Sequence, residues 1–227
     1  MEQPEIGPIV SVVAAVAPDA ATILTGKSVH LRHVDAADAG ALYSATHGDN
    51  SDPTQWTYMS YGPFEDAADM RHWMEGIQAS RDPLFMTVCD QASNTPVGVV
   101  SFLNIEPGHR TIELGNIWYV PAAQRTVVNT EVIYLLLKHC FEDLGYRRVE
   151  WKCDNLNQRS KAAATRLGFC FEGVFRQHFI VKGRNRDTAW FAIVDGDWAQ
   201  LKANFEQVLY DPATTASLRE LNEKLYG

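Results

Sequence analysis

The fold is decided by the stretch from Pro121 to Trp151, which reads PAAQRTVVNTEVIYLLLKHCFEDLGYRRVEW. It contains the end of a strand, a short loop, a long amphipathic segment and the start of another strand. The apolar stripe of that segment comprises Ile133, Leu136, Leu137, Cys140, Phe141 and Leu144. This spacing predicts a helix over Asn129–Gly145, with Gly145 at the position of a C-cap glycine. Because a strand–helix–strand unit crosses over right-handedly, the two flanking strands are expected to be parallel.

The elements on either side of this unit alternate in a different way. Apolar–polar alternation predicts strands over 27–34, 84–90, 96–107, 110–120 and 147–154, followed by a hairpin over 169–183 and 186–195. Helical spacing and capping residues predict helices over 35–46, 64–80, 157–169 and 196–209, with a helical tail after residue 211. The order predicts a mixed α/β (α+β) sheet with antiparallel N-terminal strands and one parallel pair at the centre.

The chain has 227 residues, which suits one domain with appendages. We expect an N-terminal arm over 1–25, the main domain over 26–200 and a C-terminal helical extension over 201–227. The apolar run Ile9–Ala17 is too short to span a bilayer. It also follows an acidic stretch, whereas a signal peptide has a basic one before its apolar region. We expect it to pack on the domain, and a frayed tail is the alternative.

The charge and the cysteines exclude several functional classes. A formal net charge of -8 and a pI near 5.3 argue against non-specific nucleic-acid binding, which needs a basic face. Cys89, Cys140, Cys153 and Cys170 show no Cys-x-x-Cys spacing and no accompanying histidine cluster, so we expect no metal site and no disulfide framework. A reducing cytoplasm, with no membrane partner, fits this usage best.

The loop at the start of the central helix, Gln124 to Thr130, has no glycine. A helix N-terminus presents unpaired backbone N–H groups, which bind phosphate, and these donors do not require glycine. Arg125 adds a guanidinium suited to phosphate oxygens, and Thr126 and Thr130 add hydroxyls. An ordinary solvated loop that caps the helix is the alternative.

From Ile112 to Trp190 the chain resembles the GCN5-related N-acetyltransferase (GNAT) superfamily, and more closely its RimJ/RimL-type branch, whose best-known members acetylate N-terminal amines of ribosomal proteins. The segments LRHVDAADA and YMSYGPF extend the resemblance to residues 27–198. It implies an acyl-CoA enzyme using acetyl-CoA, with the thioester in a gap between the splayed parallel strands. The sequence departs from the superfamily loop pattern Gln/Arg-x-x-Gly-x-Gly/Ala, since valine, asparagine and threonine stand at the glycine positions.

The resemblance also implies where coenzyme A binds. The backbone of the strand that ends in GNIWYV would pair with the pantetheine arm, and the amides of the following loop would hold the pyrophosphate. The cofactor-binding residues expected on this basis are Ile117, Trp118, Tyr119, Val120, Gln124, Arg125, Thr126, Val127, Val128, Asn129, Thr130, Asn157 and Ser160.

Two residues are candidates for catalysis. Glu113 lies in a strand expected to be buried, where a carboxylate is costly without a role or a partner, so we propose it as a general base acting through water. The alternative is a structural carboxylate paired with Arg110 or His109. The resemblance implies that Ser160 lies near the sulfur as an acid. Ala164 stands where many superfamily members have a tyrosine, and since serine is a weak acid, water is the alternative proton donor.

Asn157 also has two interpretations. It matches the Asn-x-x-Ser pattern of the branch together with Ser160, and it would bond the pantetheine. Alternatively, Asp154 or Asn155 caps the helix and Asn157 belongs to its first turn.

The acceptor side is the least determined part of the sequence. The candidate acceptor-binding residues are Trp56, Tyr58, Tyr61, Phe64, Arg176 and His178. The alternatives are a satellite core cluster for the aromatic residues and a structural role for the histidine. We expect the acceptor to be a small-molecule amine, with a protein N-terminus or a non-catalytic CoA-binding module as alternatives. The assembly is open, and a homodimer is one possibility.

Overall fold

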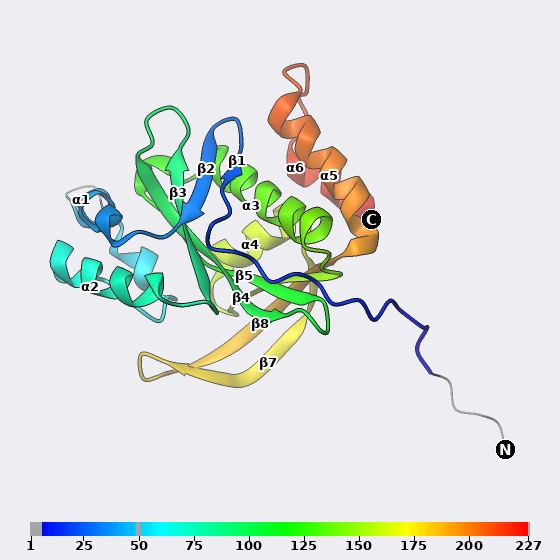
Figure 1. Ribbon diagram of the computed structural model, residues 1–227, viewed down its shortest axis with the longest axis horizontal. Coiled ribbons are helices and arrows are strands. Elements are labelled where there is room, and N and C mark those ends of the chain that lie inside the picture. The colour runs from blue at the N-terminus through cyan, green and yellow to red at the C-terminus, as the bar shows by residue number, and fades with distance from the viewer. Residues whose placement is uncertain (1–5, 49–50, 227) are drawn as a thin grey trace.

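The computed structural model describes residues 6–48 and 51–226 and has one eight-stranded sheet in the order β1-β2-β3-β4-β5-β6-β8-β7 (Figure 1). The strands are β1 (Leu24–Thr25), β2 (Val29–His33), β3 (Leu84–Asp90), β4 (Pro96–Glu106), β5 (Thr111–Tyr119), β6 (Arg148–Asp154), β7 (Cys170–Val181) and β8 (Arg184–Val194). All neighbours are antiparallel except β5 and β6, which are parallel. The predicted mixed sheet and its central parallel pair are therefore confirmed.

The helices lie close to their predicted positions. They are α1 (Ala39–His47), α2 (Ala67–Gln78), α3 (Val128–Lys138), α4 (Gln158–Arg166), α5 (Asp195–Tyr210) and α6 (Leu218–Tyr226). Short 3-10 turns at η1 (Ala36–Asp38), η2 (Pro53–Trp56) and η3 (Pro121–Ala123) were not predicted, and neither was β1. The central helix is shorter than predicted, because it widens into a π-helical turn, η4 (His139–Asp143).

The central helix buries the apolar stripe that predicted it. Ile133, Leu136, Leu137 and Cys140 are fully buried. The C-terminal helices lie beside α3 in Figure 1, at the right of the view. The Tyr134 ring of α3 stacks on Trp198 of α5. The long central helix is therefore packed on both sides, which fixes the position of its N-terminus.

The parallel pair separates along its length. Its register runs only from Thr111↔Arg148 to Leu114↔Trp151, although β5 continues to Tyr119 and β6 to Asp154. Asn116 takes a left-handed conformation with φ 53°, and the β4–β5 register shifts beside it. A bulge of this kind bends a strand and stops its pairing. The predicted splay is thus confirmed, and Asn116 is its local cause.

The chain ends meet the domain in different ways. Ala15 N–H donates to the Pro107 carbonyl and Val16 N–H to that of Leu144, while the arm before them extends away from the domain in Figure 1. At the other end, Asn222 of α6 donates to the Arg166 carbonyl at the end of α4. Within the described residues, no helix has the length and apolarity that a membrane crossing requires.

Candidate active site

A cavity of about 830 Å³ opens where β5 and β6 part. Its walls are the free ends of these strands, the loop after β5, the first turn of α4 and the segment 52–60. Since unpaired strand backbone borders it, an extended ligand can add to the sheet here by main-chain hydrogen bonds.

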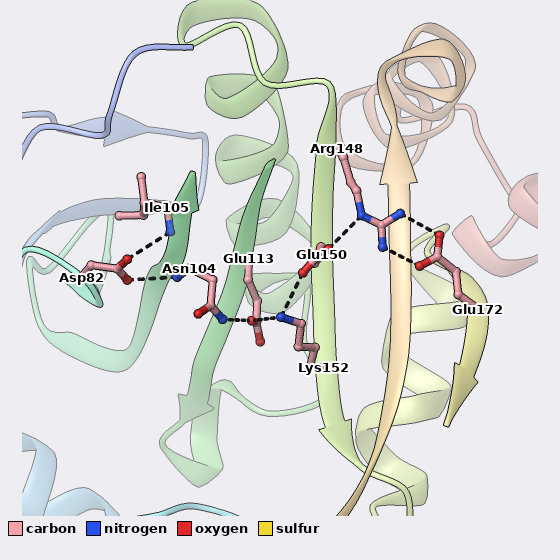
Figure 2. Close-up of polar contacts among 8 residues, drawn as sticks. All are labelled: Asp82, Asn104, Ile105, Glu113, Arg148, Glu150, Lys152 and Glu172. Atoms are coloured by element: carbon pink, nitrogen blue, oxygen red, sulfur yellow. Dashed lines mark hydrogen bonds and ion pairs between the residues drawn. The ribbon is translucent and has the colours of Figure 1, made fainter. Parts of the chain in front are cut away.

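Glu113 stands at the inner end of this cavity. Its side chain is 6% exposed, and its Oε2 accepts hydrogen bonds from Lys152 Nζ at 2.9 Å and from Asn104 Nδ2 (Figure 2). Burial raises the pKa of Glu113, and the contacts with Lys152 and Asn104 oppose that rise. Its Oε1 has no partner among residues 6–48 and 51–226 and is free to take a proton.

The alternative partners expected for Glu113 are not the ones found. Arg110 Nε donates to the Gly145 carbonyl at 2.8 Å. No ion pair links Arg110 or His109 to Glu113 within the described part of the chain. Glu113 is therefore ion-paired, but its partner is Lys152 on the neighbouring parallel strand β6.

A line of alternating charges continues from Glu113 across the sheet. Lys152 Nζ also lies 2.9 Å from Glu150 Oε2, and Arg148 bridges Glu150 and Glu172, as Figure 2 shows. Lys152 lies in addition 3.8 Å from the centre of the Trp190 ring. These contacts fix the ammonium that neutralises Glu113.

The other partner of Glu113 is positioned by an irregularity in β4. Asn104 takes φ 47°, a conformation that asparagine tolerates better than most residues. The Asp82 carboxylate accepts from the backbone N–H groups of Asn104 and Ile105 at 2.9 and 3.1 Å (Figure 2). The amide that holds Glu113 is therefore fixed by a second carboxylate behind it.

The glycine-free loop keeps free donors despite its side chains. Arg125 takes φ 60°, the left-handed conformation that glycine usually supplies. Thr126 Oγ1 donates to the Ala123 carbonyl at 2.7 Å and accepts from the Val128 N–H at 3.2 Å. The N–H groups of Arg125, Thr126, Val127, Asn129 and Thr130 donate to no acceptor in the described ranges. A phosphate can therefore bind here.

The predicted cofactor residues divide into two groups. Those that line the cavity are Ile117, Trp118, Tyr119, Gln124, Arg125, Asn129, Asn157 and Ser160. Those whose side chains do not are Val120, Thr126, Val127, Val128 and Thr130. Among the second group, Thr130 Oγ1 accepts from Arg166 Nη1 at 2.9 Å, so its hydroxyl is turned towards α4.

The first turn of α4 is capped by Asn157 itself. Asn157 Oδ1 accepts from the Ser160 N–H at 3.0 Å, so the cap is neither Asp154 nor Asn155. The Asn157 amide group remains available as a donor to the cavity. Ser160 Oγ accepts from Trp151 Nε1 at 2.9 Å, and its hydroxyl also contacts the Cys153 thiol, where burial raises the pKa of Cys153 and Ser160 opposes that rise.

Most of the aromatic residues between Trp56 and Phe64 pack in the core and do not line the cavity. Trp56 is 1% exposed and packs edge-on against Trp118 at 5.2 Å, and Phe64 is also buried. Tyr61 stacks on Trp73. Only Tyr58 of the four candidates lines the cavity, and its hydroxyl donates to the Leu156 carbonyl at 3.2 Å.

The two candidates on β7 also lie outside the cavity lining. Arg176 is exposed, and His178 packs between Phe179 and Trp190. The basic turn of this hairpin is not simply solvated, because Lys182 Nζ donates to the carbonyls of three residues: Trp56, Tyr61 and Gly62. The hairpin tip thereby closes on the aromatic segment.

Several cavity residues were missed from the sequence. Lys152 could have been found, because it alternates with the buried Trp151 and Cys153 and thus shares the face of Glu113. Arg186, which a distant hairpin brings in, had no comparable indication, and neither had Asn104, which lies outside the lining but donates to Glu113 from a bulge. No group of three or more metal-ligating side chains occurs in the described segments.

The comparisons with known proteins agree with this geometry. Residues 28–170 match the family described as acetyltransferase (GNAT) domain. A solved GCN5-related N-acetyltransferase from Brucella melitensis is 35% identical and has a TM-score of 0.87, over 93% of this chain and 98% of that one. A GNAT-family protein from Chromobacterium violaceum is 38% identical, with a TM-score of 0.77 over 87% and 100% of the two chains.

Two of the curated relatives match over shorter stretches. The ribosomal-protein-serine acetyltransferase of Escherichia coli K12 is 33% identical over 81 residues, or 36% of this chain. The chain spans 45% of that relative's length and 55% of a second relative, from Bacillus subtilis, which is about half of each.

Proposed function

We propose, from the premise that this chain belongs to the GNAT family of acetyltransferases, that it transfers an acetyl group from acetyl-coenzyme A to the primary amine of a small molecule. The observation that carries the proposal is Glu113, which is anchored through Oε2 and free at Oε1 in the cavity where the parallel strands part. That position suits a base that takes a proton from an amine, directly or through one water.

The cavity has the features that coenzyme A requires. Free amides at the start of α3 and the Arg125 guanidinium suit the phosphates, and the unpaired backbone of β5 suits the pantetheine arm. Acetyl-coenzyme A would supply the acetyl group as a thioester, which is activated towards amines. We assign the cofactor residues accordingly, with Asn157 as a side-chain donor.

The residues of this chain then have separate roles in a direct transfer. The amine nitrogen bonds to the acetyl carbon and the carbon–sulfur bond breaks, while Glu113 Oε1 accepts the amine proton. Ser160 is our candidate to return a proton to the thiolate, because it lines the cavity and the bond from Trp151 orients its hydroxyl. Holding both substrates in one cavity makes the attack effectively unimolecular.

Two observations bear on the acceptor. The contacts of Lys182 fix the β7–β8 hairpin tip on the segment that precedes the cavity wall, and we take this fixed tip to favour a small molecule. The relative named a ribosomal-protein-serine acetyltransferase favours a protein N-terminus as the second candidate. We place the enzyme in the cytoplasm because the buried residues Cys89, Cys140 and Cys153 form no disulfide with any described residue.

The test is coenzyme A release with a panel of small amines and peptide N-termini, for the wild type and for Glu113→Gln. We expect the variant to lose turnover and to keep its calorimetric affinity for acetyl-coenzyme A. Glu106→Gln, an exposed glutamate on the adjacent strand, is the matched control and should stay active. Binding of acetyl-coenzyme A without turnover on any amine would contradict the proposal and favour a non-catalytic binding module.

A further inference from the structure

The cavity contains two arginines with no ion pair in the described part of the chain, and they come from different elements. Arg125 lies on the loop before α3, and Arg186 lies on β8. The other cations of the lining are neutralised, since Lys152 pairs with Glu113 and Arg159 lies 3.2 Å from Asp52. The phosphates of coenzyme A would neutralise Arg125, whereas Arg186 has no anionic partner among the described residues.

Arg186 is held in place but not neutralised. Its guanidinium lies 5.6 Å from the centre of the Phe179 ring, and its Nε is buried with no hydrogen-bond partner. Asp154 is the remaining carboxylate of the lining. It forms no ion pair with Arg186 in the described part of the chain, so its oxygens lie more than 4.0 Å from the guanidinium nitrogens. A cation fixed on an aromatic face and facing a cavity presents its fork to a ligand.

Further polar atoms of the same hairpin lack partners. Thr188 Oγ1, Trp190 Nε1 and His178 Nδ1 are buried without a hydrogen bond. Thr188 and Trp190 alternate with Arg186 along β8, so all three project from one face of the strand. None of these three residues lines the cavity, so their unpaired atoms describe the polar surroundings of Arg186 and the anion must be recognised by Arg186 itself.

We propose that Arg186 recognises an anionic group, a carboxylate or a phosphate, on the acceptor amine. This rests on the proposed acetyl transfer and names the class of its second substrate. The acceptor is then an elongated primary amine with the anion at its far end.

The length of that acceptor follows from the strand register. Glu113 is in register with Glu150, and Glu150 with Ala192 on β8. Arg186 lies six residues further along β8, which is about 20 Å along the strand, and Glu113 lies two strands away, so their Cα atoms are more than about 20 Å apart. The side chains of Glu113 and Arg186 are too short to contact the same small group across this distance. A free α-amino acid is therefore too short to use both residues, whereas an ω-amino carboxylate is long enough.

The test compares ω-amino carboxylates of increasing chain length with their methyl esters and with ω-aminoalkyl phosphates. For the wild type, we expect kcat/KM of the longer carboxylates or phosphates to exceed that of the ester by at least about tenfold. Arg186→Gln should abolish that preference. Arg184→Gln, an exposed arginine of the same hairpin, should behave as the wild type. Preference for the carboxylate or for the phosphate identifies the anion.

Calorimetric binding of the same compounds separates this inference from the proposed function. An anion preference in binding that Arg186→Gln removes supports the recognition, even if no compound is acetylated and the proposed function fails. Equal rates and equal affinities for acids and esters in the wild type, or an unchanged preference in Arg186→Gln, would overturn it.

Discussion

Replacement of Lys152 by methionine tests how far Lys152 opposes the rise in the pKa of Glu113 that burial causes. The ammonium lies 2.9 Å from Glu113 Oε2, and the two side chains are 11% and 6% exposed. At an effective dielectric constant of about 20, unit charges at that separation attract by about 6 kcal/mol. The bond from Asn104 and incoming water replace part of this attraction. We therefore expect the pKa of Glu113 to rise by about 1 to 3 pH units in Lys152→Met.

The assay is the pH dependence of kcat/KM for amine acetylation. Burial already raises the pKa of Glu113, and Lys152 opposes that rise, so removal of the lysine moves the acid limb to higher pH. Activity should return at high pH, where Glu113 ionises. Lys202→Met removes a comparable contact, 2.8 Å from Glu142, away from the cavity and serves as the control. An unchanged acid limb in folded Lys152→Met would refute the assignment.

The same variant should change how stability depends on pH. A glutamate whose pKa is higher in the folded chain binds its proton more tightly there. The protein therefore loses stability as pH rises from the unfolded pKa to the folded pKa. Lys152→Met raises the folded pKa and so extends this pH range to higher pH. Above the window, the unpaired carboxylate should cost about 3 to 5 kcal/mol, and within it the cost should shrink by about 1.4 kcal/mol for each pH unit of acidification. Urea denaturation at several pH values measures this, and adding Glu113→Gln should restore stability but not activity.

Three other changes test neighbouring parts. Gly115→Ala would place a Cβ 2.9 Å from Leu103 Cδ2 and 3.7 Å from Glu113 Oε1, so steady-state kinetics should show a higher KM for the acceptor, with calorimetric coenzyme A affinity retained. Arg125→Gly places a glycine in a left-handed conformation, so the free energy of unfolding should stay within about 1 kcal/mol of the wild-type value. The affinity for coenzyme A should fall about tenfold, because the guanidinium is lost. An affinity equal to that of the wild type would contradict the phosphate role. Glu131→Gln weakens a buried acceptor of three hydrogen bonds from residues 27 and 28, so chemical denaturation should show a loss of about 1 to 3 kcal/mol with activity retained.

Much of the fold could be predicted because its elements carry strong periodicity. The stripe of α3 and the alternation in β5 and β6 each identify one element, and chain order then requires the parallel pair. The two-residue strand β1 is too short for any pattern. The π-helical turn after Lys138 has no breaker residue before it, so the sequence shows a continuous helix there.

The site could be predicted only where a residue conflicts with its surroundings. Glu113 was identifiable because a carboxylate in a buried strand demands a partner or a role. Trp56 carried no such conflict, since an aromatic residue serves a core or a ligand wall equally well, and tertiary packing places it in the core. Arg186 reaches the cavity only through the hairpin fold, about 70 residues away from Glu113 along the chain.

The glycine-free loop is the clearest departure from the family pattern, and its geometry is compatible with the proposed phosphate site. Glycine serves such loops by allowing positive φ and close approach, and neither requires a glycine at every position. Arg125 supplies the positive φ, and the exposed Val127 side chain, at 46%, lies where solvent rather than protein surrounds it. Thr126 satisfies one amide at the start of α3 and ties the loop to Ala123. The remaining amides are therefore held in fixed positions before a ligand arrives, so less conformational freedom is lost on binding.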